Sequence, residues 1–150
     1  MIAFAAQCGS ATIRSAADAD ALRKGCSTVE GSITFMAALN ESISLEGVQT
    51  ITGNLASENC SMAADREPNG AAFSIFSSTL TNIHGDFMGF DCIGAVNISF
   101  PNLKTIGGGF DVVNFWPLTH LDITNLDLSG HCGITSCAMS QEPTVPRMSF

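Results

Sequence analysis

The amino-acid sequence predicts an all-β fold, a parallel β-helix behind one short N-terminal helix. A motif recurs along the chain: an apolar residue, Ile or Val three residues later, Gly five residues later and a large apolar residue seven residues later. A further apolar residue stands five positions before the first residue of the second copy and of each later copy of this motif. A recurring unit that cannot bury its apolar side alone must stack on its neighbours. Together these observations predict a stacked solenoid.

The motif occurs four times, and its first apolar residue recurs a fifth time. The starts are Cys26, Val48, Leu80, Leu103 and Leu126, at intervals of 22, 32, 23 and 23 residues. The longer interval indicates an insertion, which we place at 62–70. The glycines at positions 31, 53, 85 and 108 suit a corner, either through a positive φ or because a neighbouring backbone passes close by.

Each copy carries two short alternating runs rich in β-branched and aromatic residues, such as Asn97–Phe100 and Gly108–Val113. Such runs predict strands. Because equivalent runs lie one coil apart, they pair in parallel and build two or more sheets. Packing in the interior explains the apolar residues of the repeat.

A helix is predicted just before the first copy, over 15–25. Ser15 can cap it, Asp18 favours its first turn and Gly25 is a natural stop. With Ala19 and Leu22 turned inward, this helix would cover the open end of the solenoid and hide the unpaired edge of the first coil.

Six cysteines, 13% charged residues and no CxxC pair indicate disulfides formed in an oxidising compartment. We expect the bridges Cys8–Cys26, Cys60–Cys92 and Cys132–Cys137. Cys60 and Cys92 each lie 12 residues past the start of their copy, so they should stand one above the other. A metal site with His131 beside the last pair lacks a fourth ligand and zinc-knuckle spacing, and no cofactor is expected.

Other features agree with secretion. Three Asn-x-Ser/Thr glycosylation acceptors occur, at Asn40, Asn59 and Asn97. Residues 1–7 are apolar, end in small residues and look like the remnant of a signal peptide. Residues 8–137 form the predicted solenoid, and 138–150 form a polar, Pro-containing tail. No run reaches the roughly 18 apolar residues that a membrane span needs.

Four stretches, 17–22, 26–33, 45–55 and 98–110, resemble the fungal GPI-anchored cell-wall organisation proteins of the sporulation-specific and protoplast-secreted type. Their repeat resembles the L domain of insulin and EGF receptors. The resemblance covers about Cys8 to Leu128. It implies a right-handed, leucine-rich-repeat-like β-helix in an extracellular or wall-bound glycoprotein that contributes to wall integrity. Family members carry a Ser/Thr-rich stalk and an anchor signal that this sequence lacks, so anchoring is not carried over.

Charge and motif content argue against several classes of function. A net charge of −8 disfavours nucleic acid and anionic membranes as partners. No two of the aspartates near the repeat fall where they would stack on successive coils: Asp86, Asp91, Asp111, Asp122 and Asp127. The histidines, His84, His120 and His131, fall at three different positions in the repeat, and no nucleophile elbow is present. We therefore expect no catalytic residues, although loops could still assemble a polysaccharide-cleaving site.

The expected function is binding, through an exposed sheet face or the loops that leave it. Phe90, Phe115 and Trp116 are the candidate contacts, because exposed aromatic side chains are common platforms for sugars and protein partners. Packing in the core explains Phe115 and Trp116 equally well. The insertion at 62–70 is a second candidate. The chain is thus expected to be a non-catalytic module that binds wall polysaccharide or a wall protein. The alternatives are a secreted polysaccharide enzyme and a secreted protein that recognises a protein partner.

Overall fold

The computed structural model describes residues 8–36, 39–57, 73–88, 95–111 and 119–127. Several predictions lie outside these residues: those on 1–7, 62–70 and 138–150, on Cys60, Cys92, Cys132 and Cys137, on Asn59, and on Phe90, Phe115 and Trp116.

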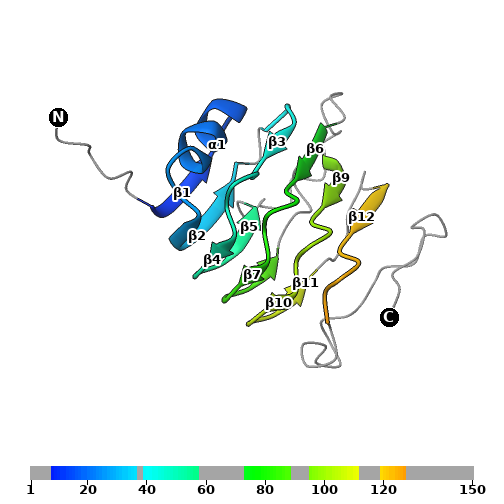
Figure 1. Cartoon of the computed structure of the whole chain (residues 1–150). Helices are drawn as coiled ribbons and strands as arrows, with labels where there is room; N and C mark the ends of the chain where they lie inside the picture. The colour runs from blue at the N-terminus through cyan, green and yellow to red at the C-terminus, as the bar shows by residue number, and fades with distance from the viewer. Residues whose placement is uncertain (1–7, 37–38, 58–72, 89–94, 112–118, 128–150) are drawn as a thin grey trace.

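The described strands stack in parallel into three sheets, so the predicted β-solenoid is confirmed (Figure 1). Sheet A contains β1 (Gly9–Ile13), β2 (Thr28–Phe35), β5 (Leu55–Ser57), β8 (Phe87–Met88) and β11 (Phe110–Asp111). Sheet B contains β2, β4 (Thr50–Ile51), β7 (Asn82–Ile83) and β10 (Thr105–Ile106). Sheet C contains β3 (Ile43–Ser44), β6 (Phe73–Phe76), β9 (Ala95–Ser99) and β12 (His120–Asp122). Sheets A and B share β2, whose first residues pair with β4 and whose last residues pair with β5.

The strand register agrees with the repeat read from the sequence. Leu55 pairs with Ile33 in the coil before it and with Phe87 in the coil after it. Ile75 of sheet C likewise pairs with Ile43 and Ile98. All six side chains are completely buried. These inward positions of the repeat therefore form apolar ladders along the interior, and the ladders are the hydrophobic core.

The repeated glycines mark the corner between sheets B and A, where successive coils touch. The Gly53 N–H donates to the Gly31 carbonyl at 2.8 Å, and the Gly85 N–H donates to the Gly53 carbonyl at 3.0 Å. A Cβ added at Gly85 would lie 2.7 Å from the carbonyl carbon of Gly53. Gly31 alone of these corner glycines also has a positive φ, +145°. Close approach of the backbone, the second of the two predicted reasons, thus explains the repeated Gly.

The predicted helix is present as α1 (Ala16–Arg23). The Ser15 side chain accepts a hydrogen bond from the Asp18 N–H at 3.4 Å, and Ala19 and Leu22 are buried. The edge of the first coil is covered differently from the prediction. Strand β1 pairs with β2 along sheet A, while α1 packs beside β1 and β3 (Figure 1). The helix therefore covers the sheet C end of the first coil, and a strand that was not predicted covers the sheet A end.

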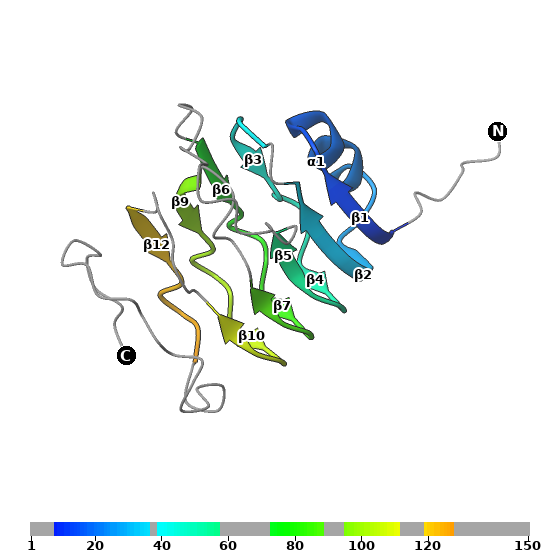
Figure 2. The same cartoon turned by 180° about the vertical axis from the view of Figure 1, so that it is seen from behind.

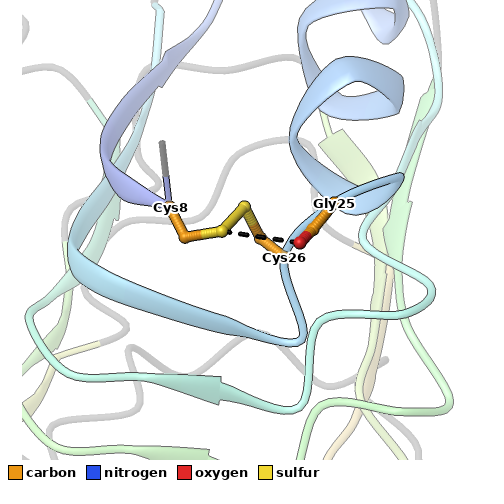
Figure 3. Close-up of a disulfide and its surroundings, with 3 residues drawn as sticks. All are labelled: Cys8, Gly25 and Cys26. Carbon is orange, nitrogen blue, oxygen red and sulfur yellow. Dashed lines mark hydrogen bonds between the residues drawn. A yellow bond between two sulfur atoms is a disulfide. The ribbon is translucent and has the colours of Figure 1, made fainter. Parts of the chain in front are cut away.

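A disulfide fastens this N-terminal cap. Cys8 and Cys26 are bonded, as predicted, with their Cα atoms 5.5 Å apart (Figure 3). Cys8 precedes β1 directly, and Cys26 follows the end of α1. The Cys8 sulfur also lies 3.6 Å from the Gly25 carbonyl oxygen. The bridge ties both ends of the segment that contains β1 and α1. Among the described residues no helix has the length and apolar character needed to cross a membrane.

Candidate functional site

The side chains on the outer face of sheet B are polar, and several of them form hydrogen bonds with one another. Its central row, one residue from each strand, is Thr28, Thr50, Asn82 and Thr105. The Thr105 hydroxyl donates to Asn82 Oδ1 at 2.8 Å, and Asn82 Nδ2 donates to the Thr81 hydroxyl at 2.9 Å. These hydrogen bonds use polar atoms that a ligand would otherwise need, so we assign this face a structural role.

The corner between sheets B and A carries a second polar ladder that the sequence analysis missed. Side-chain oxygens of Ser10, Ser32, Asn54 and Asp86 each accept a hydrogen bond from a backbone N–H of the next coil, at 2.6–3.0 Å. The donor to Asp86 is the Gly109 N–H, at 2.6 Å. A carboxylate engaged in this way completes the backbone hydrogen bonding of the corner. The Asp86 carboxylate therefore has a structural role, because it hydrogen-bonds to the backbone of the next coil.

The turn between sheets C and B is bonded in a similar way. The Glu46 carboxylate accepts from the Ser78 N–H at 2.6 Å and from the Ser78 hydroxyl at 2.9 Å. Asn102 donates to the Ser78 carbonyl at 2.8 Å, and Asn125 donates to the Pro101 carbonyl at 2.6 Å. These side chains hold successive turns in register.

Phe76 distinguishes the outer face of sheet C. It is 38% exposed, and no other large apolar side chain of the described residues is exposed. The phenylalanines at 35, 73, 87, 100 and 110 are at most 3% exposed. In the strand register Phe76 pairs with Ser44 on one side and Ser99 on the other, and Ser99 pairs with Asp122. We call Ser44, Phe76, Ser99 and Asp122 the Phe76 row.

The four strands that carry the Phe76 row lie side by side in chain order, as both views show (Figures 1 and 2). Strand β3 lies next to α1, and β12 lies at the far end of the sheet. A parallel sheet places equivalent residues directly beside one another. The row therefore runs along the solenoid axis, across the strands.

The polar side chains of the Phe76 row also form hydrogen bonds within the fold, since the Ser44 hydroxyl accepts from the Glu46 N–H at 3.2 Å. The Ser99 hydroxyl donates to Asp122 Oδ2 across 3.4 Å, which is a long contact for two oxygen atoms. The other Asp122 oxygen, Oδ1, accepts from the Thr124 N–H at 3.4 Å and from the Thr124 hydroxyl. Asn97, one outward position away on β9, has a buried Oδ1 with no hydrogen-bond partner in the described structure. This acceptor is shielded from water without a hydrogen bond in the described structure, which is costly.

Only some of the residues named in the sequence analysis lie on the outer face of sheet C. Of the glycosylation acceptors, Asn97 lies within β9 and is half-buried, whereas Asn40 is exposed in the segment before β3. Asp86 and Asp122 belong to different parts of the solenoid, the corner between sheets B and A and the face of sheet C. His84 follows β7, and His120 lies in β12. Within the described residues no three His, Cys, Asp or Glu side chains gather where they could hold a metal ion.

The aromatic residue in this surface was not among those predicted. Its outward direction could have been read from the repeat, because Ile75 and Ser77 occupy inward positions and side chains alternate along a strand. No family model, curated protein or solved structure matches the chain. The candidate site therefore rests on the Phe76 row itself.

Proposed function

We propose that this chain is a non-catalytic binding module of an extracellular, wall-associated glycoprotein, and that it binds a wall glycan through the Phe76 row. The observation that carries the proposal is a phenylalanine 38% exposed on an otherwise polar sheet face. The resemblance of the repeat to fungal cell-wall organisation proteins supports the setting. The disulfide between Cys8 and Cys26 supports an oxidising compartment.

The proposed binding chemistry needs no reaction step. The apolar C–H face of a pyranose ring packs on the exposed face of Phe76, which removes apolar surface of both from water. Hydroxyl groups of this sugar and of the sugars linked to it then exchange hydrogen bonds with Ser44, Ser99 and Asp122. A stacked sheet provides a rigid base for these contacts, so little conformational entropy is lost on binding.

A sedimentation assay tests this function. The oxidised chain is mixed with insoluble β-glucan, chitin and whole fungal wall, and soluble sugars are measured in the same tubes. We expect saturable retention without sugar release. Phe76→Ala should weaken retention about tenfold, which corresponds to about 1.4 kcal/mol. Thr28→Ala, on the outer face of sheet B, is the matched control and should bind like the parent.

A protein partner is the second candidate, because exposed aromatic side chains are also common at the centres of protein interfaces. It predicts no retention on any of the three wall materials. Sugar release would instead show turnover and would overturn the non-catalytic proposal.

A further inference from the structure

We propose that the ligand is a linear, uncharged glycan that lies along the solenoid axis, across the four strands of sheet C. This inference rests on the proposed function and specifies the ligand and its direction on the same site. It follows from the length of the Phe76 row, from the charges on the face and from the polar residues on either side of Phe76.

The first argument is length. Neighbouring strands are about 4.8 Å apart, so a row of four residues extends about 14 Å, roughly the length of three linked pyranose rings. Along the strands the outward face is uneven, since β6 has 4 residues and β9 has 5. Strand β3 has 2 residues and β12 has 3, so along either strand the outward face ends after one or two side chains. A ligand that lies across the strands therefore meets one outward side chain of all four strands, which no single strand offers.

The second argument is charge. The outward positions of sheet C contain no Lys or Arg: Ser42, Ser44, Ser74, Phe76, Asn97, Ser99, His120 and Asp122. The described basic residues are Arg14, Arg23, Lys24 and Lys104, which lie around α1 and beside sheet B. Among the described residues of this face, no Lys or Arg would offset the repulsion between the Asp122 carboxylate and a uronic acid or phosphate on the ligand. A glycan without ionised groups avoids that repulsion.

The third argument is the arrangement of polar groups around the ring. Ser44 and Ser99 flank Phe76 along the axis, one in each neighbouring coil. A sugar stacked on Phe76 therefore has its linked neighbours over serine hydroxyl groups. Asp122 follows Ser99 in the next coil, where its carboxylate can accept a hydrogen bond from a sugar hydroxyl. The row thus offers one position for stacking, Phe76, with hydrogen-bonding side chains on both sides of it.

The direction of the ligand is tested with two variants of equal size. Ser99 neighbours Phe76 across the strands, and Ser74 neighbours it along β6. A glutamine at either position extends the side chain over the adjacent surface. We expect Ser99→Gln to weaken binding at least fivefold and Ser74→Gln to leave it unchanged, with thermal unfolding confirming that both variants are folded. The reverse order would overturn the axial direction.

The class of ligand is tested by calorimetry on the full chain with soluble β-glucan and chitin oligosaccharides of one to six sugars. We expect affinity to rise over the first three or four sugars and then level off, and Phe76→Ala to reduce it about tenfold for the longer oligosaccharides. Polygalacturonate should not bind.

The outcomes separate this inference from the proposed function. No affinity for any glycan would overturn both. Binding that depends on Phe76 but not on oligosaccharide length would overturn the axial placement alone. Stronger binding of polygalacturonate than of neutral oligosaccharides would overturn the uncharged ligand. Length-dependent binding that Phe76→Ala leaves unchanged would move the site away from the Phe76 row and overturn the inference.

Discussion

Gly85 lies where two coils touch, and its hydrogen atoms fill space that a methyl group could not. A Cβ there would lie 2.7 Å from both the carbonyl carbon and the carbonyl oxygen of Gly53. We expect Gly85→Ala to lower the free energy of unfolding by about 1–3 kcal/mol, since two backbones must move apart. Gly9→Ala is the control, because nothing lies within 4 Å of a Cβ at that position. Chemical denaturation of both variants checks this, and equal stability would show that the corner can relax.

Asn40 and Asn97 differ in how accessible they are for glycosylation. Asn40 is exposed, whereas Asn97 lies within β9, half-buried, with its Oδ1 out of contact with solvent. A glycan on Asn97 would also stand beside the Phe76 row. We therefore expect glycopeptide mass spectrometry of the chain secreted from a eukaryotic host to find Asn40 occupied and Asn97 unmodified. Full occupancy of Asn97 would contradict this and would also block the proposed site.

The disulfide between Cys8 and Cys26 should stabilise the N-terminal segment that contains β1 and α1 more than the rest of the molecule. Cys8 and Cys26 are 18 residues apart, and a cross-link that closes a loop of this size contributes about 3 kcal/mol in the chain-entropy model. We expect the double variant Cys8→Ala, Cys26→Ala to lose stability by about that amount. Replacing both residues leaves the other cysteines untouched, which a reducing agent would not. Unchanged stability would mean that packing of α1 and β1 holds the cap without the bridge.

Hydrogen exchange locates the effect of losing this bridge. The Glu30 N–H donates to the Cys8 carbonyl, and the Met36 N–H donates to the Ile13 carbonyl. Both hydrogen bonds join β1 to the first coil. In the double variant these amides should exchange faster, while those of sheet C beyond β3 should exchange as before.

The elements that were predictable are those that repeat or carry a local signal. The positions of Ile83 and Gly85 follow from the spacing of the copies. Ser15, as a capping residue, predicts where the helix begins. Strand β1 has neither kind of signal. It lacks the motif, and its register with β2 shifts between Gly9 and Ala11, so its residues do not fall in step with the repeat. Tertiary pairing with β2, rather than local sequence, explains this strand.

The candidate site was predictable only as a type of surface. An exposed sheet face with an aromatic side chain was expected, but Phe76 was not identified. Nothing in composition separates Phe76 from Phe73, which lies three residues earlier in the same strand and is buried. Position in the repeat does separate them, since a strand alternates its faces. The number of sheets was open for a similar reason, because the spacing of copies does not reveal how often each coil turns.

The chain as a whole carries six basic and fourteen acidic residues, a net charge of −8, and this affects how its binding should respond to salt. Attraction between an acidic protein and a basic partner weakens as salt shortens the Debye length, from about 10 Å at 0.1 M to about 3 Å at 1 M. Stacking of a neutral sugar on Phe76 involves no such attraction.

We therefore expect retention on β-glucan or chitin to change less than twofold between about 0.1 M and about 1 M NaCl, because no ion pair forms and few counterions are released. Phe76→Ala should lower retention by the same factor at both concentrations, since packing on the ring does not depend on screening. The measurement is the sedimentation assay repeated at the two salt concentrations, with bovine serum albumin, another acidic protein, as the control for nonspecific adsorption. A steep fall in retention with salt would identify an ionic contact to a basic component of the wall. That result would favour a basic protein partner over a neutral glycan.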